Sequence, residues 1–380
     1  MSNFAAMIDE TFLYLGITLA LAAMLFVFGI LFHVLYRYTE SPVYRKALRM
    51  MIFTYCFFGL VNVLELANYA SRSATDNVLV FRITTLIIAV CQAFLFTFTM
   101  ILFINAAYVT RRRVIRELIP VLSLSAVFAV ICFTLPASFV KISAGLFTVF
   151  YICLLIRYIR LFAVTWRNAL RKLDNFFSGR EAEHLRWVNV SFYAALSIGL
   201  LALATSLAPG IRIGFICSVI YYVFYAFFAI RFIGYGFVYK RLEEALSEEN
   251  ITGEPENKNP LPSLAAAAIE TGLKDWMEKK QYLQPGITVR DVSFHIGTNN
   301  KYLSVYLNQR LNKSFRTWIN ELRIEEARRL LLEYPDMPVK EISAHVGFAK
   351  NNHFYDLFLK SAGQTPHAWR KSAPNHDAQD

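Results

Sequence analysis

The 380-residue chain is unusually apolar: 56% of its residues are hydrophobic, 15% are aromatic and only 18% are charged. In an average soluble protein about a quarter of the residues are charged. The mean hydropathy is +0.39. This composition excludes intrinsic disorder and a collagen-like repeat, and it predicts that part of the chain contacts lipid.

The net charge of +11 is concentrated in the apolar part of the chain. Residues 1–239 carry a net charge of +11, residues 240–263 carry −3 and residues 264–380 carry +3. Overall basicity is therefore not an argument for nucleic-acid binding. A DNA-binding function has to be argued from motifs in the last third of the chain.

Seven apolar stretches predict a seven-span membrane domain over residues 1–239, because each stretch provides the ~20 residues that a helix needs to cross hydrocarbon. The first stretch follows Asp9 and Glu10 and not a basic segment, so we expect a membrane span and not a signal peptide. The stretches lie near residues 11–36, 47–70, 81–107, 114–135, 139–163, 188–208 and 211–234.

The distribution of basic residues predicts the orientation of these spans. The connections after the first, third and fifth spans carry fifteen Lys and Arg residues, whereas the other three carry four. Because basic loops are retained on the cytoplasmic side, we expect the N-terminus to lie outside and the C-terminal part to lie in the cytoplasm. The external connections are short, so a signal from outside is expected to enter the bundle or to arrive through the lipid.

Polar residues within the bundle form one candidate ligand site. Asn62, Glu65 and Asn68 share one stripe of the second span, and an ionisable side chain at that depth suggests a function. Two interpretations stay open: Glu65 pairs with Arg82 and locks two helices together, or the four residues respond to a ligand or a proton. The five cysteines lie inside apolar stretches without a CxxC pair, so no disulfide or metal site is predicted.

Residues 240–263 are predicted to be a linker. A short helical extension of the last span precedes a segment in which Gly253, Pro255, Pro260 and Pro262 prevent a helix from continuing. The remaining residues, 264–380, have ordinary polarity and helical periodicity. We therefore expect an all-α protein, in which a soluble helical domain follows the bundle.

A first helix-turn-helix motif is predicted after Thr288. The pair Thr288 and Asp291 is a capping signal for a helix start, and Gly297 ends that helix in a left-handed conformation. A second short helix follows at once, which is the helix-turn-helix plan. Its expected buried residues are Tyr302, Leu303, Tyr306 and Leu307, and its expected exposed residues are Asn300, Lys301, Ser304 and Asn308.

The same plan returns about 50 residues later as PVKEISAHVGFAKNNHFYDLFLKSAGQTP. The two motifs align without a gap when His295 is matched with His345, although a slip of one residue matches the apolar positions better. Between them, an apolar stripe at helical spacing predicts one long connecting helix. The stripe consists of Trp318, Leu322, Ala327, Leu330 and Leu331.

Residues 270–372 resemble the DNA-binding domain of the AraC/XylS transcription regulators. The sequence departs from that family at Asn312, where a glycine is usual, but Asn also accepts a left-handed conformation. Asp356 takes a place where family members often have a cation; it would be repelled by phosphate, but it could accept a hydrogen bond from cytosine. The resemblance rests on Gly297, Leu303, Ser314, Phe315, Arg323, Ala327, Leu331, Ile342, Gly347, Phe348, Phe354, Phe358, Gly363, Thr365, Pro366 and Arg370.

The resemblance implies that two recognition helices enter successive major grooves of double-stranded DNA, about one helical turn (~34 Å) apart. It also implies RNA polymerase as a partner. An Asn side chain can make paired hydrogen bonds to adenine, and a Val side chain can contact the thymine methyl group. Lys350 can pair with a phosphate. The predicted DNA contacts are Asn300, Lys301, Ser304 and Val305 in the first helix, and Lys350, Asn351, Asn352, His353, Tyr355 and Asp356 in the second.

Together with the resemblance, these features predict a bacterial one-component transcription regulator embedded in the cytoplasmic (inner) membrane. We expect its bundle to sense a small-molecule effector or the state of the membrane, and we expect the chain to form a homodimer. No enzyme and no cofactor are expected, because the cytoplasmic segments contain no nucleophile set, phosphate loop or metal cluster. His295 and His345 are expected to have capping or core roles, not metal roles. Two alternatives stay open: a transporter or channel with a regulatory DNA-binding tail, and a bundle that acts only as an anchor.

Overall fold

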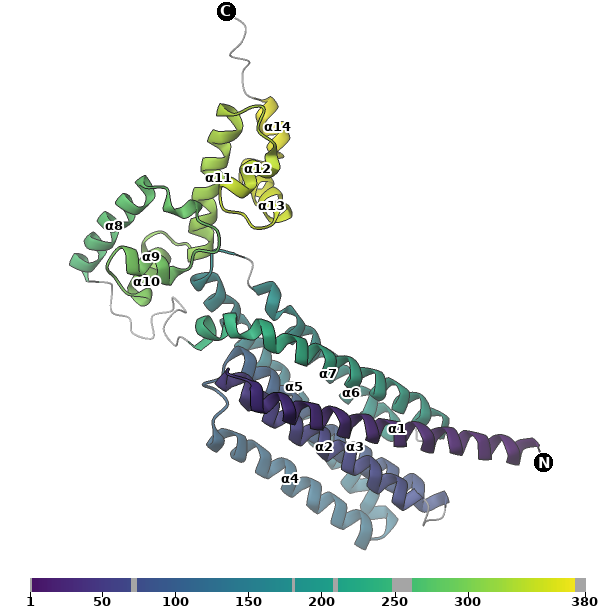
Figure 1. Cartoon of the computed structure of the whole chain (residues 1–380). Helices are drawn as coiled ribbons and strands as arrows, with labels where there is room; N and C mark the ends of the chain where they lie inside the picture. Colours follow the sequence, from purple (N-terminus) through teal and green to yellow (C-terminus); the bar gives the residue numbers. More distant parts are fainter. Residues whose placement is uncertain (1, 70–73, 180–181, 208–210, 248–261, 373–380) are drawn as a thin grey trace, which may run out of the picture. The chain divides into compact units, whose positions relative to one another are not determined.

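The computed structural model describes the chain except for residues 1, 70–73, 180–181, 208–210, 248–261 and 373–380 (Figure 1). The described residues are almost entirely helical, which confirms the predicted all-α class. They divide into two compact units. Unit 1 contains residues 1–167 and 184–247, and unit 2 contains residues 168–183 and 248–380.

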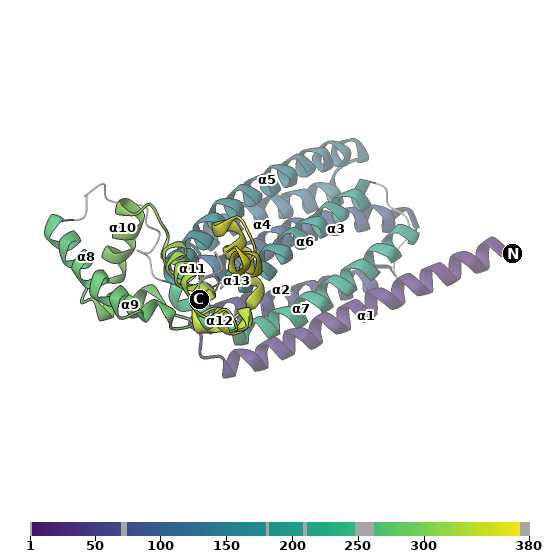
Figure 2. The same cartoon turned by 90° about the horizontal axis from the view of Figure 1, so that it is seen from above.

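Unit 1 is a bundle built from seven long helices, and each predicted apolar stretch overlaps one of them; the third stretch, 81–107, extends three residues beyond the end of its helix at Ile104. Helix α1 packs against α2 and α7, and α2 packs against α3, as Figures 1 and 2 show. The helices are α1 (Ser2–Tyr38), α2 (Pro42–Tyr69), α3 (Ala74–Ile104), α4 (Arg111–Thr134), α5 (Ala137–Phe176), α6 (Ala182–Leu207) and α7 (Ile211–Ser247).

Helix α3 forms the centre of the bundle. Within its apolar segment, Thr85–Ile104, 83% of the 18 most apolar consecutive residues are buried. In the other six helices the buried share of the corresponding 18 residues is between 22% and 39%. A helix that is apolar on all sides is expected at such a central position. The other helices turn large apolar side chains outward, with exposed fractions of 59% to 70% for Phe12, Leu19, Ile30, Ile119, Leu146 and Phe227.

All seven helices are long and apolar enough to cross a membrane. Their polar side chains form hydrogen bonds both between helices and within a single helix. The Tyr14 hydroxyl of α1 donates to the Glu65 carboxylate of α2, and the Asn62 amide donates to the Phe58 carbonyl of its own helix at 2.8 Å. The side chains of Asn68 and Arg82 lie outside the described residues, so the predicted Glu65–Arg82 pair stays a prediction.

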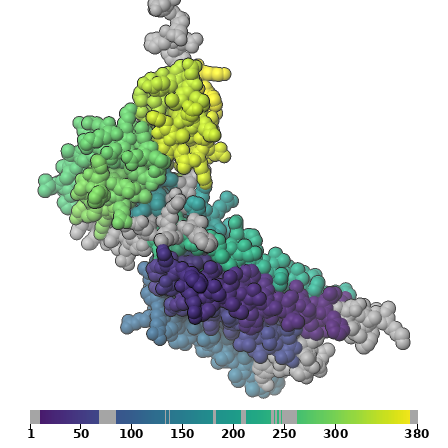
Figure 3. All heavy atoms as spheres, viewed as in Figure 1, coloured from purple at the N-terminus to yellow at the C-terminus, as the bar shows by residue number. Residues whose placement is uncertain are grey.

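Unit 2 contains the C-terminal helices, which form two adjoining lobes (Figure 3). The long helix predicted between the motifs is α11, and it contributes to the cores of both lobes. The predicted linker is partly helical, because α7 continues to Ser247, and residues 248–261 lie outside the described part of the chain. The helices are α8 (Ser263–Glu278), α9 (Val289–His295), α10 (Asn300–Arg310), α11 (Phe315–Glu333), α12 (Val339–His345), α13 (Asn351–Ala362) and α14 (Pro366–Lys371), with a 3-10 turn, η1, at Gln281–Leu283.

Each lobe has its own apolar core. In the first lobe Trp276 of α8 stacks on Trp318 of α11, with ring centroids 5.6 Å apart. In the second lobe the buried Phe354 and Phe358 of α13 pack into the same cluster as Leu331 of α11. Because α11 supplies residues to both cores, it holds the two helix-turn-helix motifs in one domain.

Candidate nucleic-acid interface

The first helix-turn-helix motif is fixed by the capping signals that the sequence predicts. The backbone N–H of Asp291 donates to the Thr288 hydroxyl at 3.3 Å, and the Asp291 carboxylate accepts from the backbone N–H of Thr288 at 2.8 Å. Gly297, with φ of 71°, follows α9 in the left-handed region that glycine adopts at low cost. The Asn299 side chain then caps α10 by accepting from the backbone N–H of Tyr302 at 2.8 Å.

Helix α10 is rotated slightly from the expected orientation. Lys301 is exposed and Asn300 and Val305 are half-buried, but Ser304 is only 1% exposed and Tyr302 is 39% exposed. The predicted exposure of Ser304 and the predicted burial of Tyr302 are therefore wrong. The stripe that packs into the core runs through Leu303, Ser304, Tyr306 and Leu307, and a serine is small enough to lie at the edge of such a stripe.

The second motif has a turn that is one residue longer than the first. Helix α12 ends at His345 and α13 begins at Asn351, whereas α9 ends at His295 and α10 begins at Asn300. The recognition helices therefore match with a slip of one residue. In this register Leu303 corresponds to Phe354, and both are 0% exposed. The gap-free alignment holds only as far as the turn.

Helix α13 presents a polar face that starts at its N-cap, Lys350. Lys350, Asn352 and Asp356 are exposed, and Asn351 and Tyr355 are half-buried. His353 is buried instead, and its ring packs edge-on against Phe348 with centroids 5.5 Å apart. The sequence placed His353 among the exposed DNA contacts, because an imidazole is polar, but the ring fills the core beside Phe348.

The two lobes are joined by Arg323 of α11, which is 2% exposed. Its guanidinium donates to the carbonyls of Tyr282 at 2.8 Å and Gln284 at 2.6 Å. Its Cζ lies 5.8 Å from the centroid of the Phe348 ring, in the turn of the second motif. Burial lowers the pKa of Arg323 to about 10, so the side chain remains a cation at neutral pH.

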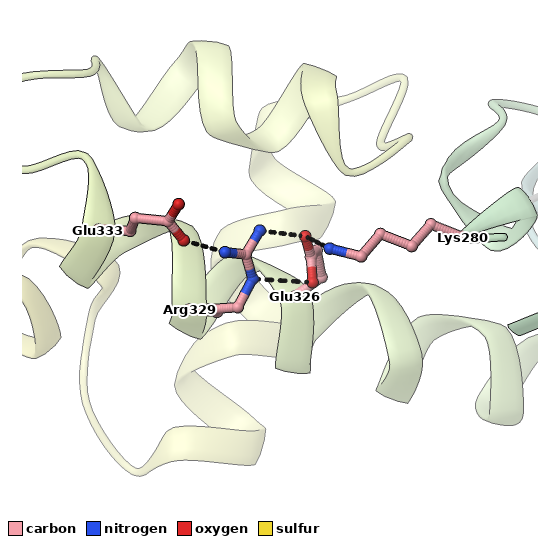
Figure 4. Close-up of polar contacts among 4 residues, drawn as sticks. All are labelled: Lys280, Glu326, Arg329 and Glu333. Atoms are coloured by element: carbon pink, nitrogen blue, oxygen red, sulfur yellow. Dashed lines mark hydrogen bonds and ion pairs between the residues drawn. The ribbon is translucent and has the colours of Figure 1, made fainter. Parts of the chain in front are cut away.

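A second set of polar contacts joins α11 to the segment after α8 (Figure 4). The carboxylate of Glu326, 8% exposed, accepts from Lys280 at 2.9 Å and from Arg329 at 2.7 Å. Arg329 also pairs with Glu333. The hydrogen bond from Arg329 lowers the pKa of Glu326, which keeps this carboxylate charged.

Two further predictions concern backbone shape and the histidines. Asn312 has a φ of 51°, which confirms that it takes the left-handed conformation usual for a glycine at this place. His295 and His345 are exposed in the last turns of α9 and α12, so the expected core role is wrong. Their position near a helix C-terminus is favourable, because the negative end of the helix dipole attracts a positively charged imidazole. Among the described residues, no group of His, Cys, Asp and Glu side chains could hold a metal ion.

The comparisons with known proteins concern this part of the chain. Residues 292–372 match the family described as "Helix-turn-helix domain". A stretch of 86 residues is 31% identical to an uncharacterized HTH-type transcriptional regulator in the cgkA 5' region of Pseudoalteromonas carrageenovora, over 23% of this chain and 50% of that protein. A stretch of 85 residues is also 28% identical to the melibiose operon regulatory protein of Escherichia coli K12, over 22% of this chain and 28% of that protein.

A solved structure, the C-terminal domain of AraT, a response regulator from Geobacillus stearothermophilus, is 25% identical over 32% of this chain and 95% of that chain, with a TM-score of 0.26. This chain spans half or less of the length of the curated relatives that it matches. The matches are thus confined to one domain. The C-terminal part of the protein contains an AraC-type helix-turn-helix domain.

Proposed function

We propose that this protein is a membrane-embedded transcription regulator that binds double-stranded DNA through its two helix-turn-helix motifs. The observation that carries the proposal is the tandem of α10 and α13, each the second helix of its motif and each with polar side chains at its exposed N-terminal end. Helices placed in this way enter the major groove. The AraC-type domain at residues 292–372 supports the same function.

The side chains available on α10 and α13 suit particular parts of DNA. Asn351 and Asn352 can make paired hydrogen bonds to adenine, and Val305 can contact a thymine methyl group. Lys301 and Lys350 suit phosphates. Ser304 and His353 are buried, so they are not included among the base-reading residues. RNA polymerase and a second copy of the chain are further partners that the family resemblance suggests.

The seven helices of unit 1 support membrane embedding. Their outward faces carry leucine, isoleucine, valine and phenylalanine, whose exposure to water would be unfavourable but whose exposure to lipid is not. The excess of Lys and Arg in alternate connections supports a DNA-binding domain in the cytoplasm. The matched relatives come from bacteria, which supports the cytoplasmic membrane of a bacterium as the location.

The bundle is proposed to sense a small molecule or a change in the membrane. The polar link between Tyr14 and Glu65 joins α1 to α2, so a ligand that replaces it would change how these helices pack. Such a signal acts only if it binds one packing arrangement more tightly than the other. Equal promoter output from the intact protein and from a bundle-deleted form, at matched levels, would show that the bundle does not regulate.

The DNA-binding proposal is tested by mapping the bound sites in the genome for the wild-type chain and for a Lys301→Ala/Asn351→Ala variant. The Asn351 contact is worth about 1–3 kcal/mol when it reads a base, and Lys301 adds a phosphate contact that positions the domain on the duplex, so the variant should lose site-specific occupancy. The control is Lys274→Ala, which removes an exposed lysine from α8. If occupancy is unchanged in the double variant, α10 and α13 are not the helices that read DNA.

A further inference from the structure

Residues 168–183 lie in the same unit as the DNA-binding domain, although the chain reaches this domain only after α7. This segment, called here the docking segment, comprises the last turns of α5, the residues that follow Phe176 and the beginning of α6. Residues 180 and 181 lie outside the described part. Helix α5 begins in unit 1, at Ala137, and continues without a break to Phe176.

The docking segment is attached to the start of the first motif. Phe177 forms an antiparallel bridge with Thr288, the residue that caps α9. Next to it, the backbone N–H and the hydroxyl of Ser178 both donate to the Ile287 carbonyl, at 3.2 and 2.7 Å. Phe177 is 7% exposed and Ser178 is 1% exposed, so this contact is part of the packed interior of unit 2.

Two carboxylates of the docking segment pair with cations of the DNA-binding domain. Asp174 accepts from Arg316, in the first turn of α11, at 2.8 Å. Glu183 accepts from Lys350, the N-cap of α13, at 3.1 Å. The two pairs therefore connect the segment to both lobes of the domain.

A third polar contact reaches the first recognition helix. The Asn308 amide donates to the Asn175 side-chain carbonyl at 3.4 Å, and Asn175 is 4% exposed. Asn308 follows Lys301 by seven residues and Val305 by three, a spacing that places all three on one face of α10. The docking segment thus contacts the face of α10 that is proposed to read DNA.

We propose that the docking segment is an internal competitor of DNA. Lys350 and Arg316 cannot pair with a carboxylate and with a DNA phosphate through the same donors at the same time, and Asn308 cannot face the major groove while it is paired with Asn175. The segment therefore has to leave the domain before DNA binds. This inference rests on the proposed DNA-binding function and adds the way in which binding is restrained.

The size of the effect follows from the exposure of the ion pairs. The side chain of Lys350 is 69% exposed and that of Arg316 is 24% exposed. Ion pairs at the protein surface are weak, even where one partner is half-buried as Arg316 is, so freeing both cations should raise DNA affinity by about two- to tenfold. Because salt also weakens the two competing ion pairs, log Kd should depend less steeply on log salt in the wild-type chain than in a variant without them, by up to about 1.8.

The first experiment uses the full chain in lipid nanodiscs and a mixed-sequence DNA duplex as the probe. The Asp174→Asn/Glu183→Gln variant removes the two carboxylates of the docking segment that pair with Arg316 and Lys350. The control, Glu278→Gln/Asp336→Asn, removes two other exposed carboxylates of unit 2 and changes the net charge equally. The first variant should bind more tightly than the control and with the steeper salt dependence. Equal affinities and slopes for the two variants would overturn the proposal.

The second experiment locks the segment in place by a Phe177→Cys/Thr288→Cys pair. Opposed residues of an antiparallel bridge have Cα atoms about 4.5–5.5 Å apart, a distance that a disulfide spans. The oxidised protein should bind the duplex at least fivefold more weakly than the same protein after reduction, so each sample is its own control. Failure of the pair to cross-link, or equal affinity in both redox states, would overturn the proposal.

These results separate the two proposals. If the wild-type chain binds DNA and loses that binding in the Lys301→Ala/Asn351→Ala variant, the proposed function stands, whatever the lock does. If the disulfide between the two introduced cysteines then leaves DNA affinity unchanged, only the proposal that the docking segment competes with DNA is overturned. If neither the unlocked nor the charge-neutralised chain binds DNA, both proposals are overturned together.

Discussion

Replacing Gly347 by alanine tests how the second motif is joined to the rest of the domain. Gly347 has a φ of 89°, and a Cβ added there would lie 2.4 Å from the Leu283 carbonyl oxygen and 3.0 Å from the Arg323 Cζ. Both neighbours belong to the junction between the two lobes. The Leu283 oxygen is a backbone atom, so it cannot turn away as a flexible side chain would.

The expected loss of stability has two parts. A left-handed conformation costs alanine about 1–2 kcal/mol relative to glycine. The overlap with the backbone adds about 1–3 kcal/mol, which is the usual cost of overpacking a well-packed site. Gly297 occupies the same place in the first motif, with a φ of 71°, and a Cβ there meets no described atom within 4 Å. Gly297→Ala should therefore cost only the ~1–2 kcal/mol of the left-handed conformation.

The assay is amide hydrogen exchange on the full chain in detergent, which reports the opening free energy of each helix separately. Gly347→Ala should lower the opening free energy of α12 and α11 by about 2–5 kcal/mol, and Gly297→Ala should lower that of α9 and α10 by about 1–2 kcal/mol. Equal losses in the two variants would refute the reasoning, because they would show that contact with Leu283 contributes nothing.

Three further predictions concern the same domain. The lowered pKa of Glu326 means that its stabilisation is complete above about pH 4.5 and is lost as pH falls through the lower folded-state pKa. Glu326→Gln should thus cost about 1–2 kcal/mol at neutral pH and little in strong acid, as measured by urea titrations at both pH values. Asn312→Gly should raise stability by up to ~1 kcal/mol, because it relieves a positive φ, whereas Asn312→Ala should lower it. Trp276→Ala should cost about 3–5 kcal/mol, measured by exchange in α8 and α11, and an unchanged α11 would show that stacking on Trp318 is unimportant.

The parts of the domain that the sequence predicts correctly are those that depend on neighbouring residues. The capping pair of Thr288 and Asp291 starts a helix wherever it occurs in such a pattern, and Gly297 and Asn312 adopt the left-handed conformations that end a helix or a turn. The exposure of Ser304 and Tyr302 is not local in this sense. It depends on which side of α10 packs against α8 and α11, and a pattern of alternating apolar and polar residues leaves that rotation uncertain by one residue.

The docking segment could not be predicted from the sequence. Asp174 and Arg316 are separated by 142 positions, and Glu183 and Lys350 by 167 positions, so no spacing or motif relates them. The sequence assigns residues 1–239 to the bundle because hydropathy changes there, whereas the structure groups residues 168–183 with the DNA-binding domain. The hydrogen bonds of Arg323 cannot be predicted from the sequence for another reason. Both of its acceptors are backbone carbonyls, which every residue has, so no residue type marks them.

The weakness of the contacts in the docking segment is what a reversible restraint requires. Two ion pairs at the protein surface and a few hydrogen bonds are together worth about 1–4 kcal/mol. Specific binding exceeds non-specific binding by about 4–10 kcal/mol. A restraint of the first size weakens non-specific binding but leaves binding at a specific site possible. A signal that weakened the restraint by about 1.4 kcal/mol would change the DNA affinity tenfold.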